Sequence, residues 1–300
     1  MEKRIALVLS SGGARGIAHI GVIEELIHSG YSISSIAGTS MGSVVGGMYA
    51  LGKLNEYKLW LLHVTKMDII KFLDLTIGHG GLVKGEKIVQ VMEGFIGNAL
   101  IEDLPIPFSA VAVDIKRHKE VVFSSGSLMK AIRASISIPT VFLPVSYDHS
   151  FLVDGGVLNP LPLDVVKRTA GDLLVSVNVN SPAPYAVTHT TAVNVSHELG
   201  YKNARESLNK RWSELINRGR TSSNPKPLEI GMFDLISESI NLMQNKLSTL
   251  SIERHRPEII IDIPSKIANV YDFYKAETLI EAGRDACRKA LESSVNQGSL

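Results

Sequence analysis

Two short apolar runs near the start of the chain are each followed by small residues and then by helical spacing. Residues 5–9 lead into the glycine-rich loop at 10–16 and a helical pattern that Gly30 ends, and residues 33–37 lead to Ser40 and a second helical pattern. A strand that is apolar at every position is buried on both faces, as in parallel sheets. The repeated order of strand, loop and helix therefore predicts a parallel sheet covered by helices.

The chain continues this alternation up to about residue 180. Apolar or alternating patterns predict further strands at residues 108–115, 120–123, 145–153, 173–179 and 258–263. Helical patterns lie between several of these strands. We therefore expect an α/β protein with three layers, α/β/α, built around a mostly parallel central sheet.

Residues 181–227 differ from the rest of the chain because they are polar, with scattered proline, threonine, asparagine and basic residues. Such a segment predicts an insertion or a mobile cap. Helical patterns occur at about 197–217 and 233–251. The second pattern places apolar side chains on one stripe, at Phe233, Ile236, Ile240, Met243, Leu247 and Leu250. We expect this stripe to pack on the core, with an acyl-chain channel or contact with lipid as alternatives.

The charge balance is close to neutral, with a formal net charge of +1. This balance gives no field strong enough to make nucleic acid the main partner. Cys287 is the only cysteine, which excludes an internal disulfide and favours a reducing compartment such as the cytoplasm. No window of the sequence approaches the ~18 uncharged apolar residues of a membrane span, so we expect any contact with a bilayer to be peripheral.

The sequence Gly38-Thr39-Ser40-Met41-Gly42 stands where the second predicted strand gives way to a helix. In a G-x-S-x-G turn the serine lies at the tip of a strained strand-turn-helix, and the small residues let strand and helix approach closely. The helix also directs its N-terminal N–H groups at the serine oxygen, which favours negative charge there. The pattern predicts a nucleophilic Ser40, and a serine that only caps the helix is the alternative.

The loop Ser10-Ser11-Gly12-Gly13-Ala14-Arg15-Gly16 can supply the hydrogen-bond donors that acyl transfer through a serine requires. Gly12 and Gly13 present backbone N–H groups without a Cβ in the way, and a neighbouring parallel strand would bring them beside Ser40. We expect Arg15 to hold the loop by donating to carbonyl groups.

A dinucleotide-binding loop is the alternative for the same segment. Ser11, Gly13 and Gly16 nearly match the pattern G-x-G-x-x-G. The first glycine of that pattern is missing, however, and no acidic residue ends the second strand to bind a ribose. The oxyanion role is therefore favoured.

Asp154, Gly155 and Gly156 end the predicted strand that contains residues 151–153. Acyl transfer needs a base, and a carboxylate at a strand end can be held there by a turn of bare backbone. An Asp-Gly pair is by itself typical of an ordinary turn. Asp154 is the candidate base, and the ordinary turn stays open as the alternative.

The order of these three elements resembles the patatin-like phospholipases, which combine a glycine-rich oxyanion loop, a G-x-S-x-G turn and a later D-G-G or D-G-A. Residues 135–139, Ser-Ile-Ser-Ile-Pro, are similar to the S-x-x-x-P block of that family. The resemblance covers roughly residues 3–179. One departure is that the family loop usually begins with a third glycine, where this chain has Ser11.

The resemblance implies Ser40 as the nucleophile, Asp154 as its base, and Gly12 and Gly13 as the oxyanion donors. The supporting motif residues are Arg15, Gly16, Gly38, Gly42, Gly155 and Gly156. The activity implied is lipid acyl hydrolysis by a serine–aspartate dyad through an acyl-enzyme, without metal or other cofactor. A carboxylate with an ordinary pKa near 3.9 is a weak base for an alcohol, so we expect burial to raise the pKa of Asp154.

The same resemblance implies substrates that are glycerophospholipid or lysophospholipid esters. From the single cysteine and the lack of a predicted membrane span, we expect a protein that is cytoplasmic or peripheral to the membrane. We divide the chain as one patatin-like domain over residues 1–300. Within it we expect a catalytic core at 1–180, an inserted helical cap at 181–256, and a final strand and helix at 257–292.

Two other functions stay open at the level of the sequence. A Ser-His-Asp carboxylesterase for soluble esters would follow the chain order of the α/β-hydrolases, with His189, His197 or His255 as the base. The serine follows only two strands, which is early for that fold. Outside the enzymes, the alternative is a degenerate patatin fold that acts as a regulatory binding module.

Overall fold

The computed structural model describes residues 3–72, 85–139, 141–182 and 232–297. The chain divides into two compact units, of which the first combines Met1–Tyr185 with Gln244–Leu300 and the second is Ala186–Met243. Helix α8 (Met232–His255) begins in the second unit and ends in the first. The predicted helix at 197–217 lies outside the described residues, as do His189 and His197.

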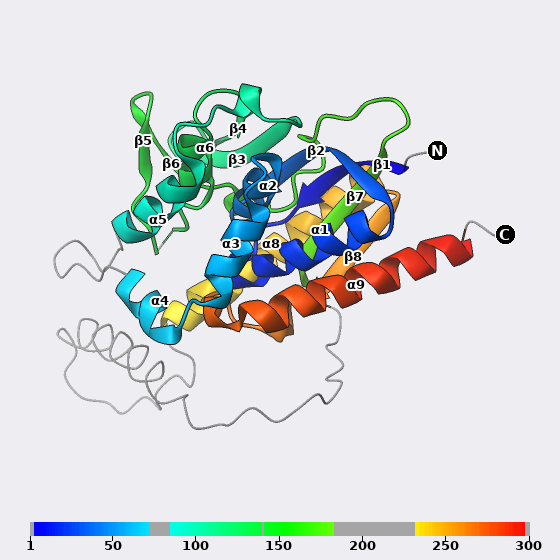
Figure 1. The fold of residues 1–300 in the computed structure, drawn as a ribbon. Helices are drawn as coiled ribbons and strands as arrows, with labels where there is room; N and C mark the ends of the chain where they lie inside the picture. Colours follow the sequence, from blue (N-terminus) through cyan, green and yellow to red (C-terminus); the bar gives the residue numbers. More distant parts are fainter. Residues whose placement is uncertain (1–2, 73–84, 140, 183–231, 298–300) are drawn as a thin grey trace, which may run out of the picture. The chain divides into compact units, whose positions relative to one another are not determined.

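The described residues form one eight-stranded sheet in the first unit (Figure 1). Five neighbouring strands are parallel, in the spatial order β3 (Phe108–Asp114), β2 (Tyr31–Thr39), β1 (Lys3–Leu9), β7 (Leu173–Ser181) and β8 (Ile259–Pro264). Strands β4 (Lys119–Phe123) and β6 (Ser150–Asp154) both pair antiparallel with β3, and β5 (Val145–Tyr147) pairs antiparallel with β6 at the end of the sheet. The sheet is therefore mostly parallel, as the sequence predicts, with an antiparallel extension on one side.

The helices follow the predicted alternation with the strands (Figure 1). The α-helices of the described residues are α1 (Ala18–His28), α2 (Met41–Ala50), α3 (Leu54–Leu62), α4 (Lys66–Phe72), α5 (Glu86–Ile96), α6 (Leu128–Ser135), α8 and α9 (Ala276–Gln297). Short 3-10 turns are η1 (Gly13–Ile17), η2 (Ile101–Asp103), η3 (Gly155–Val157), η4 (Ser265–Ile267) and η5 (Phe273–Lys275).

The single strand predicted at residues 145–153 is wrong, because this segment forms the hairpin of β5 and β6. Its turn consists of Asp148 and His149, whose φ angles are 41° and 58°. Positive φ at both central positions is the geometry of a tight hairpin turn, which the pairs Asn-Gly, Asp-Gly or Gly-Gly usually signal. Asp148 suits such a turn, but His149 stands where glycine is usual, so the sequence signal for the turn is weak.

The edges of β3 decide how the ends of β2 and β6 meet. One edge pairs with β4 along residues 110–114. The opposite edge pairs first with β2, where Val111 faces Thr39, and then with β6, where Ala112 faces Asp154. Strands β2 and β6 therefore lie end to end against the same edge of β3, and consecutive residues of β3 hold the last residue of each strand.

Alternate residues of β1 face two different layers of the fold. Leu7 and Leu9 belong to the main core, together with buried side chains of α1, α2, α5, α6 and α9. Ala6 and Val8 belong to a smaller cluster that contains the segment after β6 and, from α8, Ile252. Because both faces of a central strand are covered, the expected three-layer arrangement is present.

Helices α1 and α9 cross at two glycines. A Cβ on Gly21 would lie 1.8 Å from the carbonyl oxygen of Ile280, and a Cβ on Gly283 would lie 2.0 Å from that of Ala18. No real Cβ atom approaches an oxygen so closely. The two helix backbones can therefore pack together only because both positions carry hydrogen alone.

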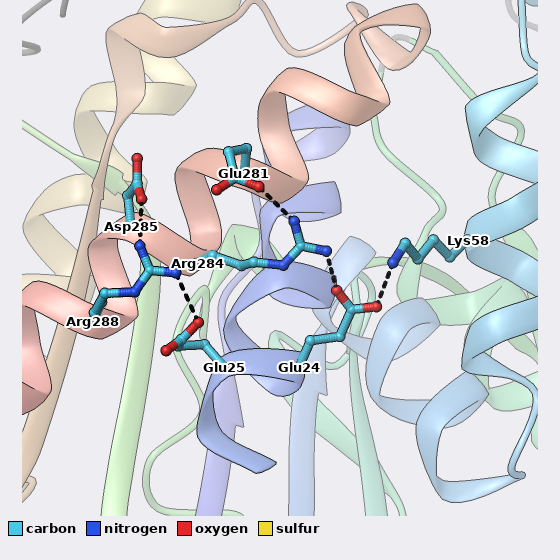
Figure 2. A network of polar contacts seen from close by, with 7 residues as sticks. All are labelled: Glu24, Glu25, Lys58, Glu281, Arg284, Asp285 and Arg288. Atoms are coloured by element: carbon cyan, nitrogen blue, oxygen red, sulfur yellow. Dashed lines mark hydrogen bonds and ion pairs between the residues drawn. The ribbon is translucent and has the colours of Figure 1, made fainter. Parts of the chain in front are cut away.

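Ion pairs flank this crossing and extend it to α3 (Figure 2). Arg284 of α9 binds Glu24 of α1, which also binds Lys58 of α3 at 2.6 Å. One turn further along α9, Arg288 binds Glu25 at 3.1 Å. Such partly exposed pairs contribute little stability individually, but together they connect three helices.

The part of α8 in the first unit does not bury the predicted apolar stripe. Leu250 is 45% exposed, whereas Ser248 is fully buried. The hydroxyl of Ser251 donates to the carbonyl oxygen of Leu161 at 2.9 Å. This part of the helix thus contacts the core through Ile252 together with the polar residues Ser248 and Ser251.

Candidate active site

Ser40 forms the sharp turn between β2 and α2, with φ 55° and ψ −124°. A residue with a side chain rarely adopts this conformation, and it places the serine at the tip of a strained turn. The flanking glycines have a steric reason. A Cβ on Gly38 would lie 2.4 Å from the Gly42 carbonyl group, and a Cβ on Gly42 would lie 2.2 Å from the carbonyl oxygen of Leu9.

The backbone of Ser40 is held on both sides, while its hydroxyl is left for other contacts. Its N–H donates to the Ser135 hydroxyl at 2.9 Å. Its carbonyl oxygen accepts from the N–H and the hydroxyl of Ser43, at 2.9 and 2.7 Å. The Ser40 side chain makes no capping hydrogen bond to α2. Ser40 is therefore the N-cap residue of α2 by position, but its hydroxyl does not cap the helix.

Asp154 lies close to Ser40 because the strands that carry them, β6 and β2, pair with the same edge of β3. It ends β6 opposite Ala112, one residue beyond the position of β3 that faces Thr39. Gly155 packs into the same corner, because a Cβ on it would lie 2.4 Å from the Val111 carbonyl oxygen and 3.0 Å from the Thr39 methyl carbon. The turn that carries the carboxylate thus packs directly against the strand that carries the serine.

The Asp154 carboxyl group is only 4% exposed. Burial raises its pKa from the ordinary value of 3.8 to about 7, although the Ser40 hydroxyl and the Gly156 N–H both act to lower it. Oδ1 accepts the Gly156 N–H at 2.7 Å. Oδ2 is buried without a regular hydrogen-bond partner among the described residues, so the contact with Ser40 is not a well-formed hydrogen bond. Catalytic hydrogen bonds are often loose before substrate binds.

The glycine loop follows β1 and lies beside the Ser40 turn. Gly13 has φ 56°, a left-handed conformation, and a Cβ on it would lie 2.6 Å from the carbonyl oxygen of Val270. A Cβ on Gly12 would lie 2.3 Å from a methyl carbon of Val179. Within the described part of the chain, the N–H groups of both glycines donate to no acceptor. They are therefore available to a negatively charged oxygen.

Several side chains fix this loop. Arg15 is buried and donates to the carbonyl oxygens of Gly12 and Ser265, at 3.3 and 3.4 Å, which are contacts of the kind expected from the sequence. His19 donates from Nε2 to the carbonyl oxygen of Ser10 at 2.9 Å, and burial lowers the pKa of this histidine to about 4. Gly16 packs against the residue after the serine, because a Cβ on it would lie 2.5 Å from the side chain of Met41.

A cavity of about 120 Å³ opens beside the serine and the loop. Ser40 and Gly13 are part of its wall. The other lining residues are apolar or aromatic: Met41, Val44, Tyr57, Trp60, Leu61, Val64, Ile69, Phe72, Ile88, Met92, Ile136, Ile138, Phe142 and Phe273. Such a lining suits a hydrocarbon chain and offers few partners to water.

Comparison with known families agrees with this arrangement. Residues 7–167, more than half of the chain, match the model of the patatin-like phospholipase family. The chain belongs to the patatin-like phospholipase family. Membership confirms the resemblance and the patatin fold expected from the sequence, and it makes the protein a lipid acyl hydrolase of the serine esterase class.

Two relatives and one solved structure are similar to this chain. An uncharacterized NTE family protein of Mycobacterium bovis is 34% identical, over 97% of this chain and 92% of the relative. Lysophospholipase NTE1 of Coccidioides immitis is 28% identical, over 99% of this chain but only 18% of that protein. The structure of VipD from Legionella pneumophila covers 98% of this chain and 67% of that chain, with 15% identity and a TM-score of 0.46.

Sequence reasoning assigned no role to several polar groups of this patatin-like site. The S-x-x-x-P block supplies two of them, since the Ser135 hydroxyl accepts the Ser40 N–H and the Ser137 carbonyl oxygen accepts the Asp154 N–H at 2.9 Å. One short segment thus holds both proposed catalytic residues. The similarity of residues 135–139 to the family block was the available signal, but it does not indicate which groups Ser135 and Ser137 contact.

Histidines do not complete a triad in the described part of this patatin-like chain. His255 is the last residue of α8 and precedes β8, so it lies near the amino-terminal ends of the parallel strands. Ser40 instead follows the carboxyl-terminal end of β2. Among the described residues, no histidine hydrogen-bonds to Ser40 or Asp154. The described residues also contain no group of three side chains suited to hold a metal ion.

None of the helices in the described residues combines the length and the apolar character needed to cross a bilayer.

Proposed function

We propose that the protein hydrolyses acyl esters of phospholipids or lysophospholipids through a Ser40–Asp154 dyad, with the N–H groups of Gly12 and Gly13 as the oxyanion hole. The observation that carries this proposal is the register at β3. Strands β2 and β6 end at consecutive positions along one edge of β3, which brings the Asp154 carboxylate to the Ser40 turn.

Acylation follows from these positions. Asp154 accepts the proton of the Ser40 hydroxyl as its oxygen attacks the ester carbonyl carbon. The carbonyl oxygen becomes negatively charged and receives the N–H groups of Gly12 and Gly13, while the N-terminus of α2 adds a favourable field. When the tetrahedral intermediate collapses, Asp154 returns the proton to the departing alcohol oxygen. Ser40 is then esterified with the fatty acid.

Deacylation uses the same groups in reverse. Asp154 accepts a proton from a water molecule, whose oxygen attacks the acyl carbon of esterified Ser40. Collapse of the second intermediate releases the fatty acid and returns the proton to the Ser40 oxygen. The apolar cavity beside Ser40 would hold the acyl chain through both steps, which accounts for a lipid substrate rather than a small soluble ester. A lysophospholipid substrate is further supported by the name of the Coccidioides relative.

Peripheral contact with lipid would involve the outer side of α3 and α4. Residues on the inner side of these helices line the cavity. On the outer side, Leu59, Leu62 and Met67 are 50%, 40% and 61% exposed. Exposed apolar side chains gathered on a short segment mark surfaces that bind partners or lipid. We assign this surface to the lipid interface, because it borders the cavity that would receive the acyl chain.

The division into a core at 1–180, a cap at 181–256 and a final strand and helix at 257–292 is part of the same proposal.

A long-chain fluorophosphonate tests the proposed nucleophile. Attack by Ser40 on phosphorus would displace fluoride and leave one covalent adduct, which intact-mass spectrometry detects. We expect one adduct on the wild type, none on Ser40→Ala, and a strongly slowed reaction with Asp154→Asn. An adduct on folded Ser40→Ala, or none on the folded wild type, would refute the assignment of the nucleophile. His255→Gln is the control and is expected to react at the wild-type rate.

A further inference from the structure

Ser11 occupies the position where the glycine loop of patatin-like proteins usually begins with glycine, and its side chain has a specific partner. The residue is 2% exposed. Its hydroxyl donates to Oε1 of Gln244 at 3.4 Å. Gln244 lies on α8 and is the residue at which this helix enters the first unit. A glycine at position 11 would leave this amide oxygen without that donor.

The other end of the Gln244 amide lies against the turn that carries Asp154. A Cβ on Gly156 would lie 2.5 Å from Nε2 of Gln244, 3.0 Å from Oδ1 of Asp154 and 3.2 Å from the Cβ of Ser11. One point in space is therefore within van der Waals reach of the glutamine, the carboxylate and the loop serine. The absence of a side chain at Gly156 is what allows the three groups to meet.

The main chain of Ser11 is fixed independently of its side chain. Its N–H donates to the carbonyl oxygen of Pro160 at 2.8 Å, and its carbonyl oxygen accepts from Nδ2 of Asn180 at 2.7 Å. The hydroxyl is thus not needed to shape the backbone of the loop locally. Its contact with Gln244 instead connects the loop to α8, and through Gly156 to the Asp154 turn.

We infer that Gln244 is a positioning residue for the dyad, and that Ser11 is the serine-for-glycine change that gives it a fixed orientation. With Oε1 held by Ser11, the N–H donors of Nε2 face the Asp154 turn. There they favour the ionised carboxylate and set the distance between the oxyanion loop and the base. This inference rests on the proposed dyad.

The pH dependence of kcat/KM for a soluble short-chain ester tests this role. Gln244→Glu places a second carboxylate beside Asp154, so the apparent pKa of the base should rise by about one unit. Ser11→Gly and Gln244→Leu should each lower kcat about three- to ten-fold with little change in KM, and the double variant should lose little more than either single variant. Lys246→Gln, at an exposed position of the same helix, is the matched control and should leave both constants unchanged.

Two results would overturn the inference. One is a pH profile of folded Gln244→Glu that matches the wild type. The other is a double variant whose loss equals the product of the two single losses, because independent residues multiply in this way. A failure of the dyad itself would look different, since the wild type would then form no fluorophosphonate adduct. Circular dichroism melting of each variant shows whether it is folded under the assay conditions.

Discussion

Replacement of Asp154 by asparagine should make the protein more stable above neutral pH while abolishing its activity. The substitution keeps the shape of the side chain, and the amide oxygen can still accept the Gly156 N–H that Oδ1 accepts at 2.7 Å. What it removes is the ionisation of a group that is only 4% exposed. An ionised carboxylate in such a place is unfavourable, because burial deprives the charge of water.

The size of the effect follows from the two pKa values. Burial raises the pKa of Asp154 to about 7 in the folded protein, against an ordinary value of 3.8. A difference of about 3 corresponds to about 4 kcal/mol, at about 1.4 kcal/mol per unit. The folded protein retains the proton between about pH 4 and pH 7, where the unfolded chain has lost it. Ionisation therefore lowers the wild-type free energy of unfolding progressively as pH rises through this window, and the full loss is reached above pH 7.

Urea unfolding of the wild type and of Asp154→Asn at intervals from pH 4 to pH 8 measures this difference. The variant should gain on the wild type by up to about 4 kcal/mol across the range, with the steepest change below pH 7. Asp103→Asn, at an exposed position, is the matched control, and its difference from the wild type should vary by less than about 0.5 kcal/mol. A pH-independent difference between the wild type and Asp154→Asn would refute the argument that the carboxylate is destabilised by burial.

Three further predictions concern activity, helix packing and the lipid surface. The kcat/KM for a soluble ester should rise as pH increases through about 7 and then level off, because only ionised Asp154 accepts a proton; a midpoint near 4 would contradict this. Gly283→Ala should lower the free energy of unfolding by about 2 to 3 kcal/mol, because its Cβ would meet a carbonyl oxygen of α1. Gly94→Ala, which has open space on α5, should instead be stabilising by about 1 kcal/mol, and equal effects of the two would refute the packing argument. Leu59→Asp should reduce hydrolysis of lipid in vesicles about ten-fold and leave a soluble ester within about two-fold of the wild type, whereas equal losses on both substrates would remove this residue from the lipid interface.

The fold class is predicted correctly from the sequence, and the local elements that carry the proposed site are found in the structure, because their signals are local. A buried parallel strand, a glycine loop and a strained serine turn each depend on residues close together in the chain. The Ser40 turn illustrates this, since the glycines at 38 and 42 are required by contacts that lie within or directly beside the turn. Burial of Asp154 also follows from its place at the end of an apolar strand.

Features that depend on distant segments were missed. The hydroxyl of Ser135 holds the Ser40 N–H across almost a hundred residues, and no local pattern indicates that partner. The contact of Ser251 on α8 could not be predicted either, because its partner is the carbonyl group of the distant Leu161. The hairpin turn at Asp148 and His149 was missed for a different reason, since its second residue is histidine where such turns favour glycine.

The shared edge of β3 has a consequence for how activity arises during folding. The serine turn is complete early in the chain, but the carboxylate is added only when β6 has paired with β3 in a single register. A shift of β6 by one residue would turn Asp154 to the other face of the sheet, and a shift by two would move it past the serine. The distance between Ser40 and Asp154 can therefore change only in steps of whole residues of strand register. If Ser40 and Asp154 act as the proposed dyad, a partly folded chain has no esterase activity, and the appearance of that activity reports that segments far apart in sequence have paired in their final alignment.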